Sequence, residues 1–128
     1  MFIRGRRLRQ NENIRNLVEE TSISVNDLIM PIFLIDGKNK VEKVPSMPGI
    51  HRKTLDKQLE DIESAINLGI NAIIIFPAVN EKLKDPLGKE ALNKKGLIPK
   101  SIRAIKKAYP RILVITDVAL DPYNSDGH

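Results

Sequence analysis

The sequence has 128 residues with a net charge of +5, and it contains neither cysteine nor tryptophan. This length fits one ordinary domain, and 41% apolar with 29% charged residues is a globular composition, not a disordered or fibrous one. The lack of cysteine excludes a disulfide framework, a thiolate zinc site and a cysteine nucleophile, and it is compatible with a cytoplasmic location.

The positive charge is concentrated at the N-terminus. Residues 1–15 contain five arginines and one glutamate, so they carry +4, whereas residues 16–128 carry only +1. An arginine-rich segment can bind phosphate, or it can bind carboxylates of a neighbouring subunit through bidentate pairs. A nucleic-acid or anionic-partner binding module is therefore an alternative function. The segment lacks the interleaved aromatic residues that would stack on bases, which disfavours nucleic acid as a partner.

No targeting or membrane segment is evident in the sequence. The N-terminus lacks the apolar stretch of about 7–15 residues that a signal peptide needs. Apolar runs such as residues 28–35 are too short to cross a bilayer. We therefore expect a cytoplasmic protein that does not bind membranes.

The first predicted elements are a helix and a strand. Ile14, Leu17 and Val18 share one helical face, which predicts a short helix over residues 12–20 that must lie on another surface. Residues 28–35 are apolar throughout, which predicts a strand buried on both faces, and residues 36–39 form a turn. Residues 41–44 are expected to form a short exposed strand, and His51 is expected to lie in a loop.

Two helices and two further strands follow. Residues 54–68 predict a one-sided helix with Thr54 as its N-cap, and residues 71–77 predict a second buried strand. Residues 78–97 are polar, with one helical turn expected near residues 90–93. Residues 98–109 predict a second one-sided helix, with Pro99 in its first turn, and residues 112–116 predict a third buried strand.

This order of strands and helices indicates an α/β fold with parallel strands. Neither a G-x-G-x-x-G turn nor a Walker A sequence is present, and a complete (β/α)8 barrel needs about 250 residues. Doubly wound sheets and (β/α)8 barrels both begin in this way. The third predicted strand has no helix after it, so we expect the sequence to be the first part of a larger α/β fold.

The segment after the third strand is the richest in chemistry. Residues 117–128 contain three carboxylates, two hydroxyls and one imidazole, and they follow the carboxyl end of a predicted parallel strand, where such folds place their active sites. On spacing alone, a solvated strand-to-helix loop with Asp117 as a helix cap is the favoured interpretation.

At these residues the sequence resembles the porphobilinogen synthase (5-aminolevulinate dehydratase) family, and the resemblance extends over the whole chain as its N-terminal portion. Several uncommon strings in the same order carry it. The matching segments are Arg6–Arg9 (RRLR), Asn13–Thr21, Asp27–Phe33 (DLIMPIF), Ser46–Ile50 (SMPGI), Leu68–Pro77, Lys84–Ala91 (KDPLGKEA) and Asp117–Asp121 (DVALD).

The resemblance implies a (β/α)8 hydro-lyase that condenses two 5-aminolevulinate molecules into porphobilinogen, with loss of two waters, in haem and tetrapyrrole biosynthesis. It implies a homo-oligomer, an octamer in the family, in which an arm over residues 1–24, with Arg6, Arg7 and Arg9, contacts a neighbouring subunit. Residues 25–128 would be the first β/α units of the barrel and would end in the active-site loop, so we expect the sequence to be part of a longer chain. The two lysines that form imines with the substrates would lie outside this chain, so none of Lys100, Lys106 and Lys107 is assigned that role.

The resemblance also assigns site residues. Asp117 matches the family's catalytic aspartate, which contacts the substrate amine, and Asp121 and Ser125 match substrate-binding positions. Ala119 and Asp121 stand where zinc-dependent members have cysteine. Because carboxylates favour hard cations, the resemblance implies magnesium rather than zinc, with Asp121 as a possible ligand. Asp126 replaces a histidine that is common in the family, and it receives no role.

Overall fold

The computed structural model describes residues 5–127 of the protein, so Arg4 and His128 lie outside the described residues. Within that range five strands form one sheet in the order β2-β3-β1-β4-β5. The strands are β1 (Met30–Ile35), β2 (Val41–Lys43), β3 (His51–Lys53), β4 (Ala72–Ala78) and β5 (Leu113–Thr116). The α-helices are α1 (Glu12–Leu17), α2 (Leu55–Asn67) and α3 (Leu97–Ala108). Single 3-10 turns are η1 (Arg7–Arg9), η2 (Val25–Asp27), η3 (Glu81–Leu83), η4 (Lys89–Leu92) and η5 (Asp121–Tyr123).

Parallel pairing of β1, β4 and β5 organises the sheet. Phe33 of β1 lies opposite Phe76 of β4, and Ile75 of β4 lies opposite Thr116 of β5. The carboxyl ends of these three strands therefore lie along one edge of the sheet. On the other side of β1, β3 pairs in parallel and continues into the antiparallel β2.

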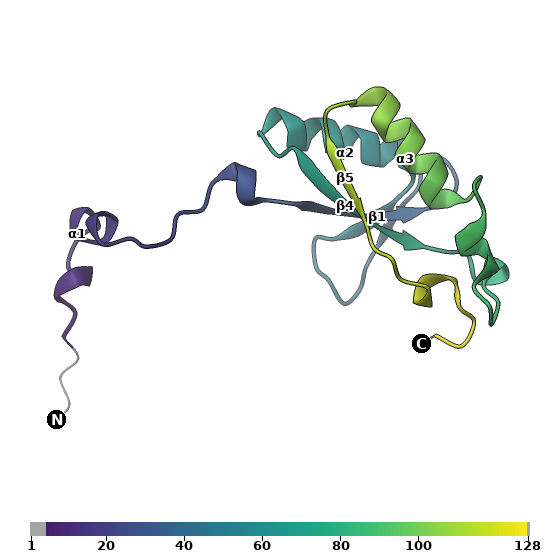
Figure 1. Cartoon of the computed structure of the whole chain (residues 1–128), viewed down its shortest axis with the longest axis horizontal. Helices are drawn as coiled ribbons and strands as arrows, with labels where there is room; N and C mark the ends of the chain where they lie inside the picture. The colour runs from purple at the N-terminus through teal and green to yellow at the C-terminus, as the bar shows by residue number, and fades with distance from the viewer. Residues whose placement is uncertain (1–4, 128) are drawn as a thin grey trace.

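The hydrophobic core lies between one face of this sheet and the helices α2 and α3, which Figure 1 shows on the same side. Alternate strand residues are fully buried there against one residue of each helix, because side chains along a strand point to opposite faces. These core residues are Ile32, Leu34, Ile73, Ile75, Ile62 and Ile105.

The opposite face of the sheet is less buried than the apolar runs predicted. Phe33 and Phe76 stack there with ring centroids 5.5 Å apart, and both are only half-buried. Leu113 of β5 is 58% exposed. The prediction of strands buried on both faces is therefore wrong for residues 5–127, because these residues supply a helical layer for one face only.

The arm extends away from the sheet, and the two figures show it from different sides. Its helix is shorter than predicted, since α1 ends at Leu17 and not at residue 20. Leu17 is 84% exposed, so no packed face stabilises a longer helix within the described residues. Before β1, Ser24 and Asp27 form a capping box around η2, and the strand begins at Met30, two residues later than predicted.

One other local prediction was wrong. His51 lies in β3 and not in a loop; the three residues of this strand are polar, so they gave no strand pattern. Thr54 is the N-cap residue of α2, as predicted, and its carbonyl accepts from the Gln58 N–H at 3.0 Å. The Thr54 hydroxyl accepts no hydrogen bond from the helix. It accepts one from the Lys40 backbone N–H at 3.1 Å, which ties the turn after β1 to the helix. The helical turn expected near residues 90–93 is confirmed as η4.

Ser101 of α3 gives a test of the core. It is 0% exposed, and its hydroxyl has no hydrogen-bond partner among the described residues. Because an apolar group avoids the cost of burying an unsatisfied hydroxyl, we expect Ser101→Ala to leave the free energy of unfolding unchanged or to raise it by about 1 kcal/mol. Urea denaturation followed by circular dichroism measures this.

The matched control is Ile105→Ala in the same helix, which should cost about 2–5 kcal/mol because it leaves a cavity. A loss above about 1 kcal/mol in Ser101→Ala would show that this hydroxyl has a partner in the folded protein.

Candidate active site

A cavity of about 520 Å³ opens at the carboxyl ends of β4 and β5. The strand ends, the first turn of α3, η4 and the chain after β5 all contribute to its wall. The lining residues are Ile75, Phe76, Pro77, Ala91, Leu92, Ile98, Pro99 and Thr116 to Tyr123. Carboxyl ends of parallel strands are where α/β proteins bind their ligands, so this cavity is the candidate active site.

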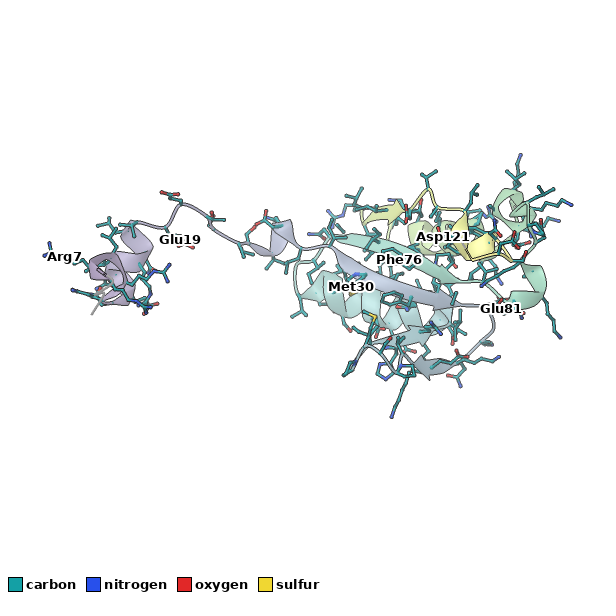
Figure 2. The ribbon with its side chains drawn as sticks, turned by 90° about the horizontal axis from the view of Figure 1, so that it is seen from below. Arg7, Glu19, Met30, Phe76, Glu81 and Asp121 are labelled. Atoms are coloured by element: carbon teal, nitrogen blue, oxygen red, sulfur yellow. The ribbon has the colours of Figure 1, made fainter. Side chains whose placement is uncertain are left out.

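The structure brings together two of the three site residues that the sequence predicted. Asp117 and Asp121 both line the cavity, and Ala119 lies between them. Figure 2 shows Asp121 on the same end of the molecule as Phe76. Ser125 is not among the lining residues. Its hydroxyl donates to Oδ1 of the neighbouring Asp126 at 3.1 Å.

The cavity combines apolar walls with exposed carboxylates. Phe76 and Pro77 are among the apolar residues of the wall, and the side chains of Asp117 and Asp121 are exposed to solvent. Within residues 5–127 neither carboxylate forms an ion pair with lysine, arginine or histidine. Such a site favours a small organic molecule with a positively charged group, such as an ammonium.

Tyr123 is a site residue that the sequence reasoning missed. It lines this cavity and a neighbouring one of about 240 Å³, which Lys95 and Lys100 also line. Burial, with a further contribution from the negative charge of Glu90, raises the pKa of the Tyr123 phenol above its ordinary value of 10.0. The phenol therefore stays protonated at neutral pH and can donate a hydrogen bond. The sequence contained one signal that could have identified Tyr123 as a site residue: it lies within the polar segment 117–128.

The described residues do not by themselves complete a metal site. Within residues 5–127 no three His, Asp, Glu or Cys side chains lie close enough together to hold an ion. Asp121 offers one exposed carboxylate, whereas magnesium takes octahedral oxygen coordination. Any cation bound here would need ligands beyond these side chains.

The arm lies far from the cavity. Arg6, Arg7 and Arg9 are exposed, and Figure 2 shows Arg7 at the end of the molecule opposite Asp121. These arginines therefore do not complete the site of their own chain in this structure. None of the helices that the structure describes has the length and apolar character to cross a membrane.

A parallel sheet with helices outside and carboxylates at the carboxyl ends of its strands is the arrangement of (β/α)8-barrel enzymes, of which this chain provides the first part. The family model described as delta-aminolevulinic acid dehydratase matches residues 2–128. The chain belongs to this family, as the sequence motifs predicted.

Individual relatives agree with the family assignment. The chain is 46% identical over 128 residues to delta-aminolevulinic acid dehydratase of Bradyrhizobium diazoefficiens, covering 100% of the chain and 36% of that protein. For the enzyme of Chlamydia pneumoniae the identity is 42%, covering 98% of the chain and 38% of that protein.

A solved structure has the same fold. It is delta-aminolevulinic acid dehydratase (porphobilinogen synthase) of Toxoplasma gondii in complex with the reaction product porphobilinogen. It aligns with a TM-score of 0.90 and 40% identity, covering 100% of this chain and 36% of that one. The predicted fold class, the N-terminal part of a barrel, is thereby confirmed. The chain spans little more than a third of the length of these relatives.

Proposed function

We propose that the protein containing this chain is a porphobilinogen synthase, a hydro-lyase that condenses two 5-aminolevulinate molecules into porphobilinogen with loss of two waters. The observation that carries the proposal is the family match over residues 2–128, to which the product complex of a structural relative adds support. Its place would be in haem and tetrapyrrole biosynthesis. The family assignment accounts for the arm, so we do not propose a nucleic-acid binding module.

The proposed roles follow from the cavity. Asp117 at the end of β5 would hold the ammonium group of 5-aminolevulinate by its negative charge and accept or return a proton at its carboxylate. Asp121 would add a second carboxylate, and Ser125 is proposed to bind substrate when its loop closes. The wall around Phe76 would exclude water. The imine-forming lysines are expected outside these 128 residues.

The role of Asp117 is testable by substitution. Because a positioned acid or base contributes about 10²–10⁴-fold to a rate, we expect Asp117→Asn and Asp117→Ala to lower porphobilinogen formation by that factor. A colorimetric assay of the product measures it. Glu63→Gln is the control, since Glu63 is an exposed carboxylate on α2 that does not line the cavity. Undiminished activity of Asp117→Ala would refute the assigned role.

For the metal, we propose magnesium rather than zinc. Two features support this: by the resemblance to the family, Ala119 and Asp121 stand where zinc-dependent members have cysteine, and a carboxylate favours hard cations. Asp121 would supply one ligand, with the remaining ligands coming from outside the described residues. No catalytic step is assigned to the ion.

Metal removal tests this proposal. A zinc-selective chelator should leave activity intact, whereas full chelation should lower it and added magnesium should restore it. Asp121→Ala should weaken the response to magnesium, while Glu63→Gln should retain it. Strict dependence on zinc, without rescue by magnesium, would contradict the assignment.

We also propose that the arm, residues 1–24, docks on a neighbouring copy of the chain in a homo-oligomer, an octamer by resemblance to the family. The exposed apolar side chains of Leu17 (84%) and Ile23 (82%) support this, as do the exposed Arg6, Arg7 and Arg9.

The proposed location is the cytoplasm, although the relative from Glycine max is named as chloroplastic.

Deletion of residues 1–24 should lower the number of subunits per particle, because it removes both the apolar and the cationic contacts of the arm. Light scattering coupled to size-exclusion chromatography measures that number. Replacing Arg6, Arg7 and Arg9 together by alanine should weaken assembly less, and more visibly at low than at high salt. An unchanged particle mass after the deletion would overturn the proposal.

A further inference from the structure

The loop after β4 makes backbone hydrogen bonds to the segment that carries the candidate site. The Asp85 N–H donates to the Tyr123 carbonyl at 3.3 Å, and the Ser125 N–H donates to the Asp85 carbonyl at 3.3 Å. Together these bonds form a single parallel bridge between Asp85 and Asn124. One residue of the β4–α3 loop thus contacts both sides of Asn124, seven residues beyond Asp117.

The Asp85 carboxylate holds the same loop in shape. Its Oδ1 accepts from the Leu87 N–H at 2.8 Å, and its Oδ2 accepts from the Lys89 N–H at 3.0 Å. The Asp85 carbonyl also accepts from the Gly88 N–H at 3.0 Å. Both carboxylate oxygens are therefore used within the loop, so the backbone of Asp85 is fixed in the position from which it binds the site segment.

Two further contacts join the same surfaces. Gly88 is buried with φ of +60°, and a Cβ placed on it would lie 3.7 Å from Cβ of Tyr123, so this turn packs directly against the tyrosine. The Asn124 side-chain amide donates to the Pro86 carbonyl at 3.5 Å, while its oxygen accepts from the Asp126 N–H at 2.6 Å. The loop then continues into η4, whose residues Ala91 and Leu92 line the cavity.

We infer that Asp85 is a positioning residue for the active site. It does not line the cavity of Asp117 and Asp121, and within residues 5–127 its side chain accepts hydrogen bonds from its own loop, at Leu87 and Lys89. Through that loop it fixes the segment from Asp121 to Asp126, and hence the direction from which Asp121 and Tyr123 face the cavity. The assignment to a reaction rests on the proposed function, but the mechanical link between the two loops does not.

The two hydrogen bonds of the Asp85 carboxylate predict how substitutions at this position should rank. Asparagine in place of Asp85 keeps one oxygen that can accept from the Leu87 N–H, but it loses the charge and the second acceptor for Lys89. Alanine loses both bonds. Since a hydrogen bond to a charged acceptor is stronger than a neutral one, the order of effect should be alanine, then asparagine, then the native residue.

Hydrogen exchange read by mass spectrometry tests the link directly, in the intact protein. In Asp85→Ala we expect amides of residues 121–127 to exchange about tenfold faster, with a smaller increase in Asp85→Asn. Peptides from β1 and α2 should keep their native exchange. The matched control is Asp27→Ala at the end of η2. It removes an aspartate that also accepts two hydrogen bonds within its own turn, from the Ser24 N–H at 2.7 Å and the Ser24 hydroxyl at 2.9 Å, but that does not line the cavity.

Two exchange results would overturn the inference: unchanged exchange of residues 121–127 in Asp85→Ala, or an equal increase in β1 and α2, which would indicate general destabilisation.

The kinetic measurement is a separate test of the role in the reaction. If the protein forms porphobilinogen, kcat/KM should fall about tenfold in Asp85→Ala, with partial recovery in Asp85→Asn. Native kinetics with a loosened segment would refute a positioning role in the reaction. If the wild-type protein lacks this activity, the proposed function fails and exchange alone decides the link.

Discussion

The parallel pairing of β1, β4 and β5 is the constraint on which the rest of the structure depends. It sets Ile32 and Leu34 of β1 beside Ile73 and Ile75 of β4, and this apolar surface holds α2 and α3 on one face. It also brings the carboxyl ends of the three strands to the same edge. The loops that leave those ends, 79–96 after β4 and 117–127 after β5, become neighbours for that reason, although they are far apart in sequence.

The packing on the two faces of the sheet explains how the chain relates to a complete barrel. The helix-facing residues are fully buried, while Phe33, Phe76 and Leu113 on the other face retain exposed surface. In a (β/α)8 barrel that second face is the packed interior, filled by side chains from all eight strands. The strands β1, β4 and β5 place these side chains on one face of the sheet, but the remaining strands that would pack against that face in a complete barrel are not among residues 5–127. The apolar character of the runs at 28–35 and 71–77 therefore reflects the whole barrel more than the part described by residues 5–127.

The sequence predicted the features that depend on local pattern or on uncommon motifs. Long one-sided helices and apolar strands gave α2, α3, β1, β4 and β5, and the DVALD string placed Asp117 and Asp121 in one segment. It missed β3, whose three polar residues carry no strand pattern, and the exact end of α1, which depends on contacts that sequence periodicity does not report. It also missed Tyr123 and Asp85, because their importance comes from a contact between two loops 38 residues apart, as in the bond from Asn124 to Pro86.

The electrostatics of the cavity indicate what its occupant must provide. Asp117 and Asp121 place two negative charges beside an apolar wall, and within residues 5–127 neither has a cationic side chain paired with it. A ligand with an ammonium group, or a hard cation, is attracted by this negative charge, whereas an anion is repelled. Arg6, Arg7 and Arg9 lie instead in the exposed first part of the arm, and Figure 2 shows Arg7 at the end of the molecule opposite Asp121. Anionic groups are therefore attracted at that end and cationic groups at the cavity, so the two ends of the described molecule can bind groups of opposite charge.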